Sequence, residues 1–408
     1  MPLIARYAIV TLTPLALLLL GATAWGGFAV MALVWLTLVA ALLDGLLAPP
    51  APDDADHAPW PNRLSVTLAA GHLLLLPLVL VALAAPGLGI GQKIALFFAT
   101  ASFMGQVSHP NAHELIHRRE PWLRRLGAAV YVSVGFGHHV SAHRLVHHRH
   151  VGTPDDPNTP LPGESFWGYL PRAWREGFHA GLDCEEDRLE ARGLPPRHWR
   201  NPYWAWVGGT VLALILAALI AGPVGLLAYL GLVVLSGGQI LMSDYVQHYG
   251  LQRLELPSGR REPVGPHHSW NAPRGFSSYL MMNAPAHSEH HLHPDRPYDR
   301  LTARAEGPIL PWSLPVMAML ATIPPVWHRV MDRRALKVME AVEARIAAGE
   351  IGQTPEPAAP AVAPSVPEEI ETQASPTPPP RAGAAPLPPV ETASDDAALI
   401  ARVQGMLQ

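Results

Sequence analysis

Cysteine and charged residues are both scarce in this chain of 408 residues. The single cysteine, Cys184, excludes a disulfide framework, a cysteine-rich zinc module and an iron–sulfur or rubredoxin domain on the same chain. Charged residues make up 15% of the sequence and hydrophobic residues 49%, whereas a typical soluble domain has about 25% charged residues. This shortage of charge indicates a membrane protein. The chain also lacks a dinucleotide-binding fingerprint, and nothing in it indicates a nucleic-acid partner.

Six apolar stretches are long enough to cross a bilayer as helices, which takes about 20 residues each. They run at about Tyr7–Trp25, Phe28–Ala48, Leu64–Ala85, Leu88–Val107, Trp204–Ala221 and Val224–Met242. Within each consecutive pair, only a few residues rich in glycine and proline separate the two stretches, which predicts three tight hairpins on one side of the membrane. The long polar connections then lie together on the other side. The sequence therefore predicts an all-α fold, a bundle of six transmembrane helices with a helical, histidine-rich cap.

The basic residues set the orientation of this bundle. Of the 29 lysines and arginines, only Lys93 lies near the predicted hairpins, so the positive-inside rule places both termini and the long loops in the cytoplasm. We therefore expect an integral protein of a bacterial inner membrane. As an alternative, residues 1–24 resemble a cleaved signal peptide. Cleavage would leave five spans and place one terminus against the charge bias, so retention is the favoured interpretation.

Two further apolar stretches, Gly127–Val140 and Ile309–Trp327, are predicted to be buried or interfacial helices on the cytoplasmic side. A span through either would break the charge asymmetry. Within the predicted spans, Asp44 is expected near an interface, and His72 is expected to face the bundle without a chemical role.

The chain is predicted to have three parts. Residues 1–340 form the membrane-embedded domain, and residues 341–393, rich in proline and alanine, form a disordered linker. Residues 394–408 are predicted to form a short amphipathic helix capped by Ser394. That helix is either a fraying terminus or a docking tag for a partner.

The chain has 21 histidines, and these are its main candidates for metal ligands. Eight of them form three short motifs, or boxes, on the predicted cytoplasmic side. The boxes read His113-Glu-Leu-Ile-His117, His143-Arg-Leu-Val-His147-His148 and His287-Ser-Glu-His290-His291. On a helix, residues four apart share one face and can bind one ion, and the adjacent histidine of each HH pair can reach a second ion. Eight imidazoles are too many for one ion, so two metals are the economical conclusion. Imidazole suits Fe, Zn, Cu and Ni.

The other histidines fall outside this spacing. We interpret His57, His179, His198 and His328 as hydrogen-bonded or exposed side chains. We interpret His138, His139, His150, His267, His268 and His293 as loop residues or outer partners of the metal ligands.

The boxes resemble those of the integral-membrane di-iron desaturase and hydroxylase superfamily, and in particular its alkane 1-monooxygenase branch, which includes the membrane monooxygenases of aromatic methyl groups. Three stretches carry the finer resemblance over roughly residues 1–340. They are HHRHVGTPDDP from His147, DYVQHYGLQR from Asp244, and SWN at Ser269 together with HSEHHLHPDR from His287. The second stretch contributes a ninth histidine, His248.

The chain departs from the branch pattern beside the boxes. Ala142 stands where glutamate is usual, Val146 where glycine is usual, and Gln247 where another carboxylate is usual. Ala284-Pro285-Ala286 replaces the usual Leu-Gln-Arg before the third box. All nine histidine positions remain, so these departures bear on substrate and rate rather than on metal binding.

The resemblance implies a centre of two non-haem irons. Its ligands would be His113, His117, His143, His147, His148, His248, His287, His290 and His291. The outer carboxylate partners, chosen by nearness in sequence, would be Glu114, Asp155, Asp156, Asp244 and Glu289. No catalytic residue beyond the ligands is named, and the substrate-binding residues remain unassigned.

The resemblance further implies O2-dependent hydroxylation of a hydrophobic hydrocarbon taken from the bilayer, such as an alkane at its terminal carbon. Electrons would come from rubredoxin or a ferredoxin served by an NAD(P)H-dependent reductase. A basic stretch holding Arg118, Arg119, Arg124 and Arg125 could steer an acidic carrier, or it could be ordinary positive-inside charge.

Three alternatives stay open from the sequence. One is a fatty-acyl desaturase or hydroxylase of the same superfamily. Another is an intramembrane zinc protease built on His113, Glu114 and His117, because HExxH is also the zincin motif. The last is a metal carrier or sensor without enzymatic activity.

Overall fold

The protein is described by a computed structural model over residues 1–51, 60–303 and 306–351. Within these ranges the regular elements are all helical, and β-structure is limited to two isolated bridges, Glu255 with Arg261 and Asn271 with Ile309. The predicted all-α class is confirmed. His57, most of the predicted linker and the whole predicted terminal helix lie outside the described residues. The last described helix, α15 (Pro324–Ala347), continues past residue 340, where the linker was expected to begin.

Four helical segments are long and apolar enough to cross a membrane. They are α1 (Leu3–Thr23), the segment Gly27–Asp44, α4 (Trp60–Ala84) and α11 (Tyr203–His248). The second segment comprises α2 (Gly27–Val34), the π-helical turn η1 (Trp35–Val39) and α3 (Ala40–Asp44). Their large apolar side chains, including Leu216, Leu219 and Leu227 of α11, are widely exposed on the surface of the protein. Such a surface suits lipid rather than water.

The predicted count of six spans is not reproduced as six separate helices. The fifth and sixth predicted stretches lie on either side of a sharp kink in α11, where two helical parts meet at the non-helical backbone of Gly222 (φ 60°, ψ −158°). The fourth stretch is divided between α5 (Ile90–Phe103) and the π-helical turn η2 (Met104–Ser108). Pro110 explains why the winding changes there, because proline has no N–H to donate to the preceding turn. The number of membrane crossings therefore stays a prediction.

The short turns of the bundle meet at one end. A Cβ on Gly26, in the turn between α1 and α2, would lie 2.7 Å from Cδ of Gln92 and 2.8 Å from Cδ2 of Leu88, which follow α4. Gly225, just after the interruption of α11, lies within 3.9 Å of the Leu80 carbonyl by the same measure. The three predicted hairpins are thus grouped on one side of the bundle.

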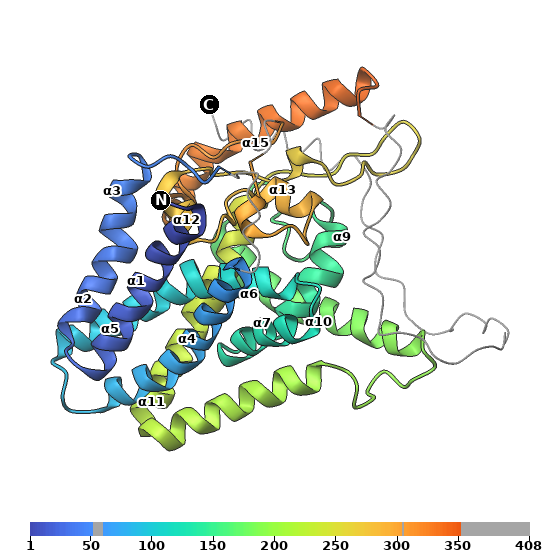
Figure 1. The fold of residues 1–408 in the computed structure, drawn as a ribbon. Coiled ribbons are helices and arrows are strands. Elements are labelled where there is room, and N and C mark those ends of the chain that lie inside the picture. Colours follow the sequence, from blue (N-terminus) through green and yellow to red (C-terminus); the bar gives the residue numbers. More distant parts are fainter. Residues whose placement is uncertain (52–59, 304–305, 352–408) are drawn as a thin grey trace. The chain divides into compact units, whose positions relative to one another are not determined.

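The opposite end carries the histidine-bearing elements (Figure 1). They are α6 (His109–Ile116), α8 (His139–Ser141), η3 (Ala142–His147), α9 (His148–His150), α10 (Phe166–Glu190), η4 (Pro266–His268) and α13 (His287–Leu292). Two helices without a histidine, α7 (Pro121–Ser133) and α12 (Gly275–Leu280), lie among them in the chain. At this end Asp44 accepts a hydrogen bond of 2.7 Å from the backbone N–H of Ser277, and Arg6 donates to the hydroxyl of Tyr279 at 3.3 Å. The N-terminal helices are therefore attached directly to the cap.

Buried aromatic rings reinforce this attachment. Tyr7 of α1 is fully buried and lies against Tyr279 and Tyr298, with ring centroids 5.1 Å and 4.8 Å apart. Tyr298 belongs to η5 (Tyr298–Arg300).

The two ambiguous apolar stretches form short helices: α7 has 13 residues and α14 (Leu314–Ala321) has 8. Neither is long enough to cross a bilayer.

Candidate metal centre

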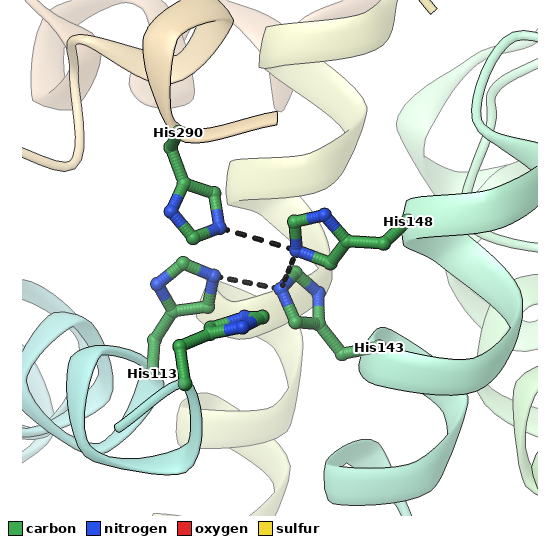
Figure 2. Close-up of side chains that lie close together, drawn as sticks. His113, His143, His148 and His290 are labelled. Atoms are coloured by element: carbon green, nitrogen blue, oxygen red, sulfur yellow. Dashed lines mark hydrogen bonds between the residues drawn. The ribbon is translucent and has the colours of Figure 1, made fainter. Parts of the chain in front are cut away.

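Five histidines from four elements converge in a first cluster. Their side-chain nitrogens lie within 4.8 Å of one another, and the residues are His113, His117, His143, His148 and His290. Figure 2 shows four of these rings turned toward a common point from α6, η3, α9 and α13. The Nε2 atoms form a chain in which His143 lies 2.8 Å from His113 and 2.9 Å from His148, and His148 lies 3.2 Å from His290.

Four more histidines form a second cluster, His147, His248, His287 and His291. All four are buried. The Nε2 atom of His287 lies 2.9 Å from that of His248 and 3.1 Å from that of His291. The two clusters adjoin, because His147 and His148 are neighbours in sequence and the rings of His148 and His291 lie 4.7 Å apart. Together the clusters hold all nine histidines that were singled out from the sequence.

Hydrogen bonding alone does not account for these contacts. One imidazole nitrogen either donates one proton or accepts one, yet Nε2 of His143, His148 and His287 each has two nitrogen neighbours. Two nitrogens bound to one ion at about 2.1 Å and at right angles would lie about 3.0 Å apart. The separations of 2.8–3.2 Å match that edge length. Each cluster could therefore hold a metal ion.

Unpaired buried nitrogens give a second test of metal binding. Nε2 of His117 in the first cluster and Nε2 of His147 in the second are buried without a hydrogen-bond partner. Leaving such a group unpaired costs about 1–3 kcal/mol. A metal ion in each cluster would provide the missing partner, so the residues fit the group that the sequence predicts.

Two ligands of the second cluster have their proton fixed on the outer nitrogen. Nδ1 of His147 lies 2.8 Å from Oδ2 of Asp156, and Nδ1 of His248 lies 3.0 Å from the backbone carbonyl of His268. Neither oxygen can donate a proton, so both Nδ1–H groups donate. The lone pairs of the two Nε2 atoms therefore face the cluster, as metal binding requires.

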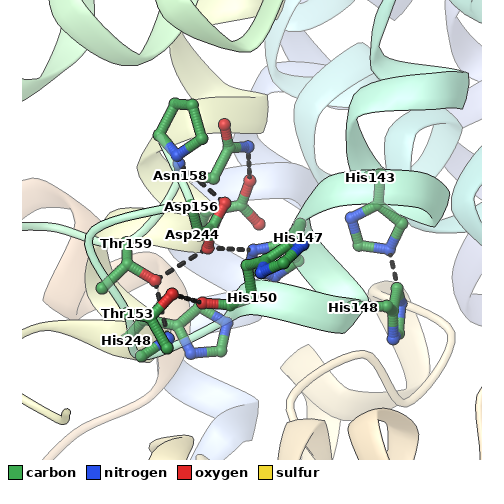
Figure 3. A network of polar contacts seen from close by, with 12 residues as sticks. His143, His147, His148, His150, Thr153, Asp156, Asn158, Thr159, Asp244 and His248 are labelled. Atoms are coloured by element: carbon green, nitrogen blue, oxygen red, sulfur yellow. Dashed lines mark hydrogen bonds and ion pairs between the residues drawn. The ribbon is translucent and has the colours of Figure 1, made fainter. Parts of the chain in front are cut away.

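Asp156 is the best-placed outer carboxylate. Besides His147, it accepts a hydrogen bond from the Thr159 hydroxyl at 2.7 Å and one from the backbone N–H of Asn158 at 3.0 Å (Figure 3). Asp244 lies beside this group, where it accepts a bond of 2.6 Å from the Asn158 side chain. The Asp244 carboxylate also lies within 4.8 Å of ring nitrogens of His143 and His147. Asp156 and Asp244 thus form one network around the second cluster.

Burial sets the charge of the clusters. It lowers the pKa of His113, His143 and His287 well below the usual value, and neighbouring histidines lower it further. These rings are therefore neutral near pH 7, the form that binds metal. Burial also acts to lower the pKa of His147, but the Asp156 carboxylate outweighs it and the net shift is upward. The same pairing lowers the pKa of Asp156 despite its burial, so Asp156 is an anion.

The other three outer candidates have different surroundings. Glu114 forms a 2.7 Å ion pair with Arg118 and accepts a hydrogen bond from the Tyr298 backbone. Glu289 is paired with Arg296. Asp155 is exposed. Of the five carboxylates named from sequence, Asp156 is the one for which a hydrogen bond to a box histidine is seen.

The position of Glu114 separates a metal-peptidase mechanism from the alternatives. A zincin needs this glutamate free to activate water, whereas here Arg118 holds it on a different side of α6 from the histidines. We expect Glu114→Gln to keep the bound metal and to lower the free energy of unfolding by about 1–3 kcal/mol, because Arg118 loses its partner. Metal analysis and thermal unfolding would check this. If Glu114→Gln abolished the catalytic activity of the protein while its metal content and stability stayed unchanged, the peptidase mechanism would be favoured.

The winding of η3 bears on how the second box divides between the clusters. An α-helix would put His143 and His147, four apart, on one ion. In the π-helical turn η3, whose hydrogen bonds join residues five apart, His143 lies in the first cluster with His148 and His147 lies in the second cluster, while nitrogens of His143 and His147 also lie within 4.8 Å of each other beside Asp244. The third box follows the α-helical rule, because His287 and His291 share one cluster and His290 reaches the other.

Two of the residues that depart from the branch pattern, Gln247 and Ala142, make specific contacts with neighbouring segments. The Gln247 side chain donates to the Ala284 carbonyl at 3.2 Å, which ties α11 to the segment before the third box, and it accepts from Ser243 at 2.7 Å. Ala142 faces Gly181 of α10, where an added Cβ would lie 2.9 Å from the Ala142 nitrogen. The two backbones approach so closely that the small side chain of Ala142 suits this position.

Sequence reasoning missed His109 and Tyr131, which lie behind the first cluster. Nδ1 of His109 is 2.9 Å from the Tyr131 hydroxyl, and the His109 ring is 6.1 Å from that of His113. The ring of His139 stacks on that of His143 at 5.0 Å. The i, i+4 spacing of His109 before His113 was the available signal.

His72 is a structural link within the bundle, hydrogen-bonded to the hydroxyls of Ser108 and Ser133 at 2.9 Å and 2.8 Å.

Comparison with known proteins gives an independent line of support. The model of the fatty acid desaturase family matches residues 92–320, more than half of the chain and a range that contains all nine histidines. Alkane 1-monooxygenase 2 of Pseudomonas aeruginosa is 32% identical over 243 residues, 60% of this chain and 64% of that protein. Alkane 1-monooxygenase 1 of Alcanivorax borkumensis is 34% identical over 254 residues, 61% of this chain and 62% of that protein.

A more distant relative is the xylene/toluene monooxygenase hydroxylase component of Pseudomonas putida. It is 27% identical over 247 residues, 60% of this chain and 65% of that protein. The matches thus span a little less than two thirds of the length of these relatives. The resemblance expected from the three sequence stretches is confirmed.

Proposed function

The chain belongs to the fatty acid desaturase family, and from this membership and the two histidine clusters we propose that it is a membrane-bound, O2-dependent hydroxylase of hydrocarbons. The substrate is an alkane or a similar hydrophobic hydrocarbon, and the product is the primary alcohol. One observation carries the proposal: nine imidazoles from separate segments point their nitrogens into two adjoining clusters of five and four. The names of the relatives direct the proposal to alkanes and aromatic methyl groups rather than to fatty acids.

Each cluster holds one iron in this proposal, giving two non-haem irons per chain. The irons would provide the capacity to activate O2 for attack on an unreactive C–H bond, which no amino-acid side chain has. The protein supplies neutral imidazoles, and Asp156 adds negative charge beside them. Buried apolar residues such as Val107, Val146 and Val151, near the histidines in sequence, limit the access of water.

The bilayer is the source of substrate in this scheme. The exposed apolar faces of α2, α5 and α11 suit a protein embedded in lipid, where alkanes concentrate. The orientation with both termini and the clusters in the cytoplasm of a bacterium is part of the proposal. It is supported by the grouping of the short turns at the end opposite the histidines and by the isolation of Lys93 near those turns.

The experiment is metal analysis of the detergent-purified chain, combined with Mössbauer spectroscopy of protein grown on iron-57 and product analysis with n-octane, toluene and a fatty acyl substrate. About two irons per chain and terminal alcohols from n-octane would support the proposal. A desaturated or hydroxylated fatty acid as the main product would favour the other branch of the family. One zinc without iron would favour the peptidase, and metal without an O2-dependent product would favour a carrier or sensor.

Electrons for turnover come from outside the chain, and rubredoxin or a ferredoxin with its NAD(P)H-dependent reductase is the proposed source. The basic stretch near the clusters now divides into two classes. Arg118 pairs with Glu114, and Arg124 donates to the backbone carbonyls of Arg118 and Arg119. Arg119 and Arg125 are exposed, but Arg119 forms a 2.6 Å ion pair with Asp295, so Arg125 is the better placed of the two to meet an acidic carrier.

Reversing one of these exposed charges gives a direct test of docking. We expect Arg125→Glu to slow carrier-driven turnover severalfold at low ionic strength, with the difference fading at high salt because charges are screened there. Lys93→Glu is the matched control, since it makes the same charge change at the other end of the bundle. Steady-state rates over a range of salt concentrations would measure the effect. Equal rates for Arg125→Glu and the wild type at low salt would contradict docking at this surface.

A further inference from the structure

A buried carboxylate lies in the connection between α11 and α12, outside both histidine clusters. Glu262 and His268 are each 0% exposed, and His267 is 8% exposed. Ligand-type atoms of the three residues lie within 4.8 Å of one another, so they could be taken for a third metal site. None of the three belongs to the nine proposed ligands.

The pattern of protons argues against a metal at this place. The backbone N–H of Gly265 donates to Nδ1 of His268 at 2.9 Å. Because Nδ1 accepts, the proton of the neutral His268 ring is on Nε2, which lies 3.0 Å from Oε1 of Glu262. That Nε2–H donates to the carboxylate and has no lone pair for an ion. His267 completes the group, with its Nε2 at 2.9 Å from Oε2.

Glu262 also organises the surrounding loop. Its Oε1 accepts a 2.9 Å hydrogen bond from the backbone N–H of Leu254, and its backbone carbonyl accepts one of 2.7 Å from the Arg253 side chain. Burial acts to raise the pKa of Glu262, but the bonds from the two histidines outweigh it and lower the pKa to about 2. The carboxylate is therefore ionised and is saturated by donors.

The other side of His268 faces the second cluster. The backbone carbonyl of His268 accepts the Nδ1–H of His248 at 3.0 Å, which leaves the lone pair of His248 Nε2 directed at the cluster. Trp270 fixes the adjoining segment of chain, because its backbone N–H donates to the Gln247 carbonyl at 2.7 Å and its indole N–H donates to the Tyr249 carbonyl at 2.9 Å. Glu262 is thus linked to one ligand through a single backbone carbonyl.

We propose that Glu262 and His268 are positioning residues that hold His248 in the orientation and tautomer needed to bind metal in the second cluster. Glu262 orients the His268 ring, the ring fixes the turn Pro266–His268, and the turn presents its carbonyl to His248. The first cluster has no member in contact with this carbonyl, so the effect is selective. This inference rests on the proposed function, in which both clusters hold iron.

The test uses the full chain with Glu262→Gln, which keeps the shape but cannot accept both histidine N–H groups. We expect its affinity for one of the two irons to fall about tenfold, the lower end of the range for outer partners of metal ligands, while the other iron stays bound as in the wild type. Chelator titration followed by Mössbauer spectroscopy resolves the two irons. Glu255→Gln is the matched control, because Glu255 is an exposed carboxylate of the same loop, and it should behave as the wild type.

A second variant, His268→Gln, should give the same selective loss. The double variant should lose no more than either single one, because both residues act through the same carbonyl. Unchanged titration of Glu262→Gln would overturn the inference. So would loss of both irons in parallel with a lower melting temperature, since that is the signature of a structural role alone. A wild-type chain that binds two ions of another metal would overturn the proposed function while leaving the selective loss measurable, and a wild type without bound metal would overturn both.

Discussion

Replacing His287 with alanine is expected to remove about one of the two metal ions and to lower hydroxylation more than about 100-fold. Nε2 of His287 lies 2.9 Å and 3.1 Å from those of His248 and His291. The substitution therefore removes the imidazole that contacts both of these candidate ligands of the second cluster. Removing an outer partner of a metal ligand typically costs 10–100-fold, and losing the ligand itself should cost more. Elemental analysis and the rate of alcohol formation from n-octane would measure both effects.

His179→Ala is the control for this substitution. His179 lies on α10 and is exposed, so its removal takes away an imidazole of the same chain without touching either cluster. It should leave the iron content and the rate unchanged. If His287→Ala kept two irons and full activity, the assignment of the second cluster as a metal site would be wrong.

Replacing Asp156 with asparagine is expected to lower iron affinity or hydroxylation by about 10–100-fold. Oδ2 of Asp156 accepts hydrogen bonds both from His147 and from the Thr159 hydroxyl. In asparagine, either a neutral oxygen replaces the charged one or an N–H₂ group faces the His147 N–H and repels it. In the first case the bond from His147 loses its charged acceptor, and in the second the ring loses the partner that fixes its tautomer. Iron retention against a chelator and the turnover rate would measure the loss.

The adjacent carboxylate offers a close control. Asp155→Asn removes the same charge one residue away, but Asp155 is exposed, so it should resemble the wild type. An equal loss for Asp155→Asn would mean that the general charge of the loop matters rather than the bond to His147. A fully active Asp156→Asn with its complete iron content would contradict the role of this carboxylate.

Much of the fold was predictable because it follows from local composition. The run of apolar residues in α1 and α4 requires helices in lipid, where backbone groups must be bonded within their own segment. The boundaries were less predictable. The Gly222–Pro223 break appears in the sequence as a loop between two spans, yet the chain resumes its helix directly after one residue of non-helical backbone.

Eight of the nine candidate ligands were predictable because their spacing repeats, and the ninth, His248, came from the resemblance of its stretch to the family; how the nine are grouped was not predictable. Residues four apart were expected to share an ion, and this holds for His113 with His117 and for His287 with His291. His143 and His147 are divided between the two clusters, although their nitrogens also lie within 4.8 Å of each other beside Asp244, and the spacing alone does not reveal the π-helical winding of η3.

The sequence by itself determined the class of protein, the helical fold and the choice of the nine candidate imidazoles, because hydropathy and short motifs are properties of contiguous residues. Only the tertiary structure decided how those imidazoles divide between two clusters and which groups support them. His148 meets His290 across 142 residues of sequence, and His248 is supported by the His268 carbonyl. Such contacts depend on how distant segments pack, which no local pattern specifies.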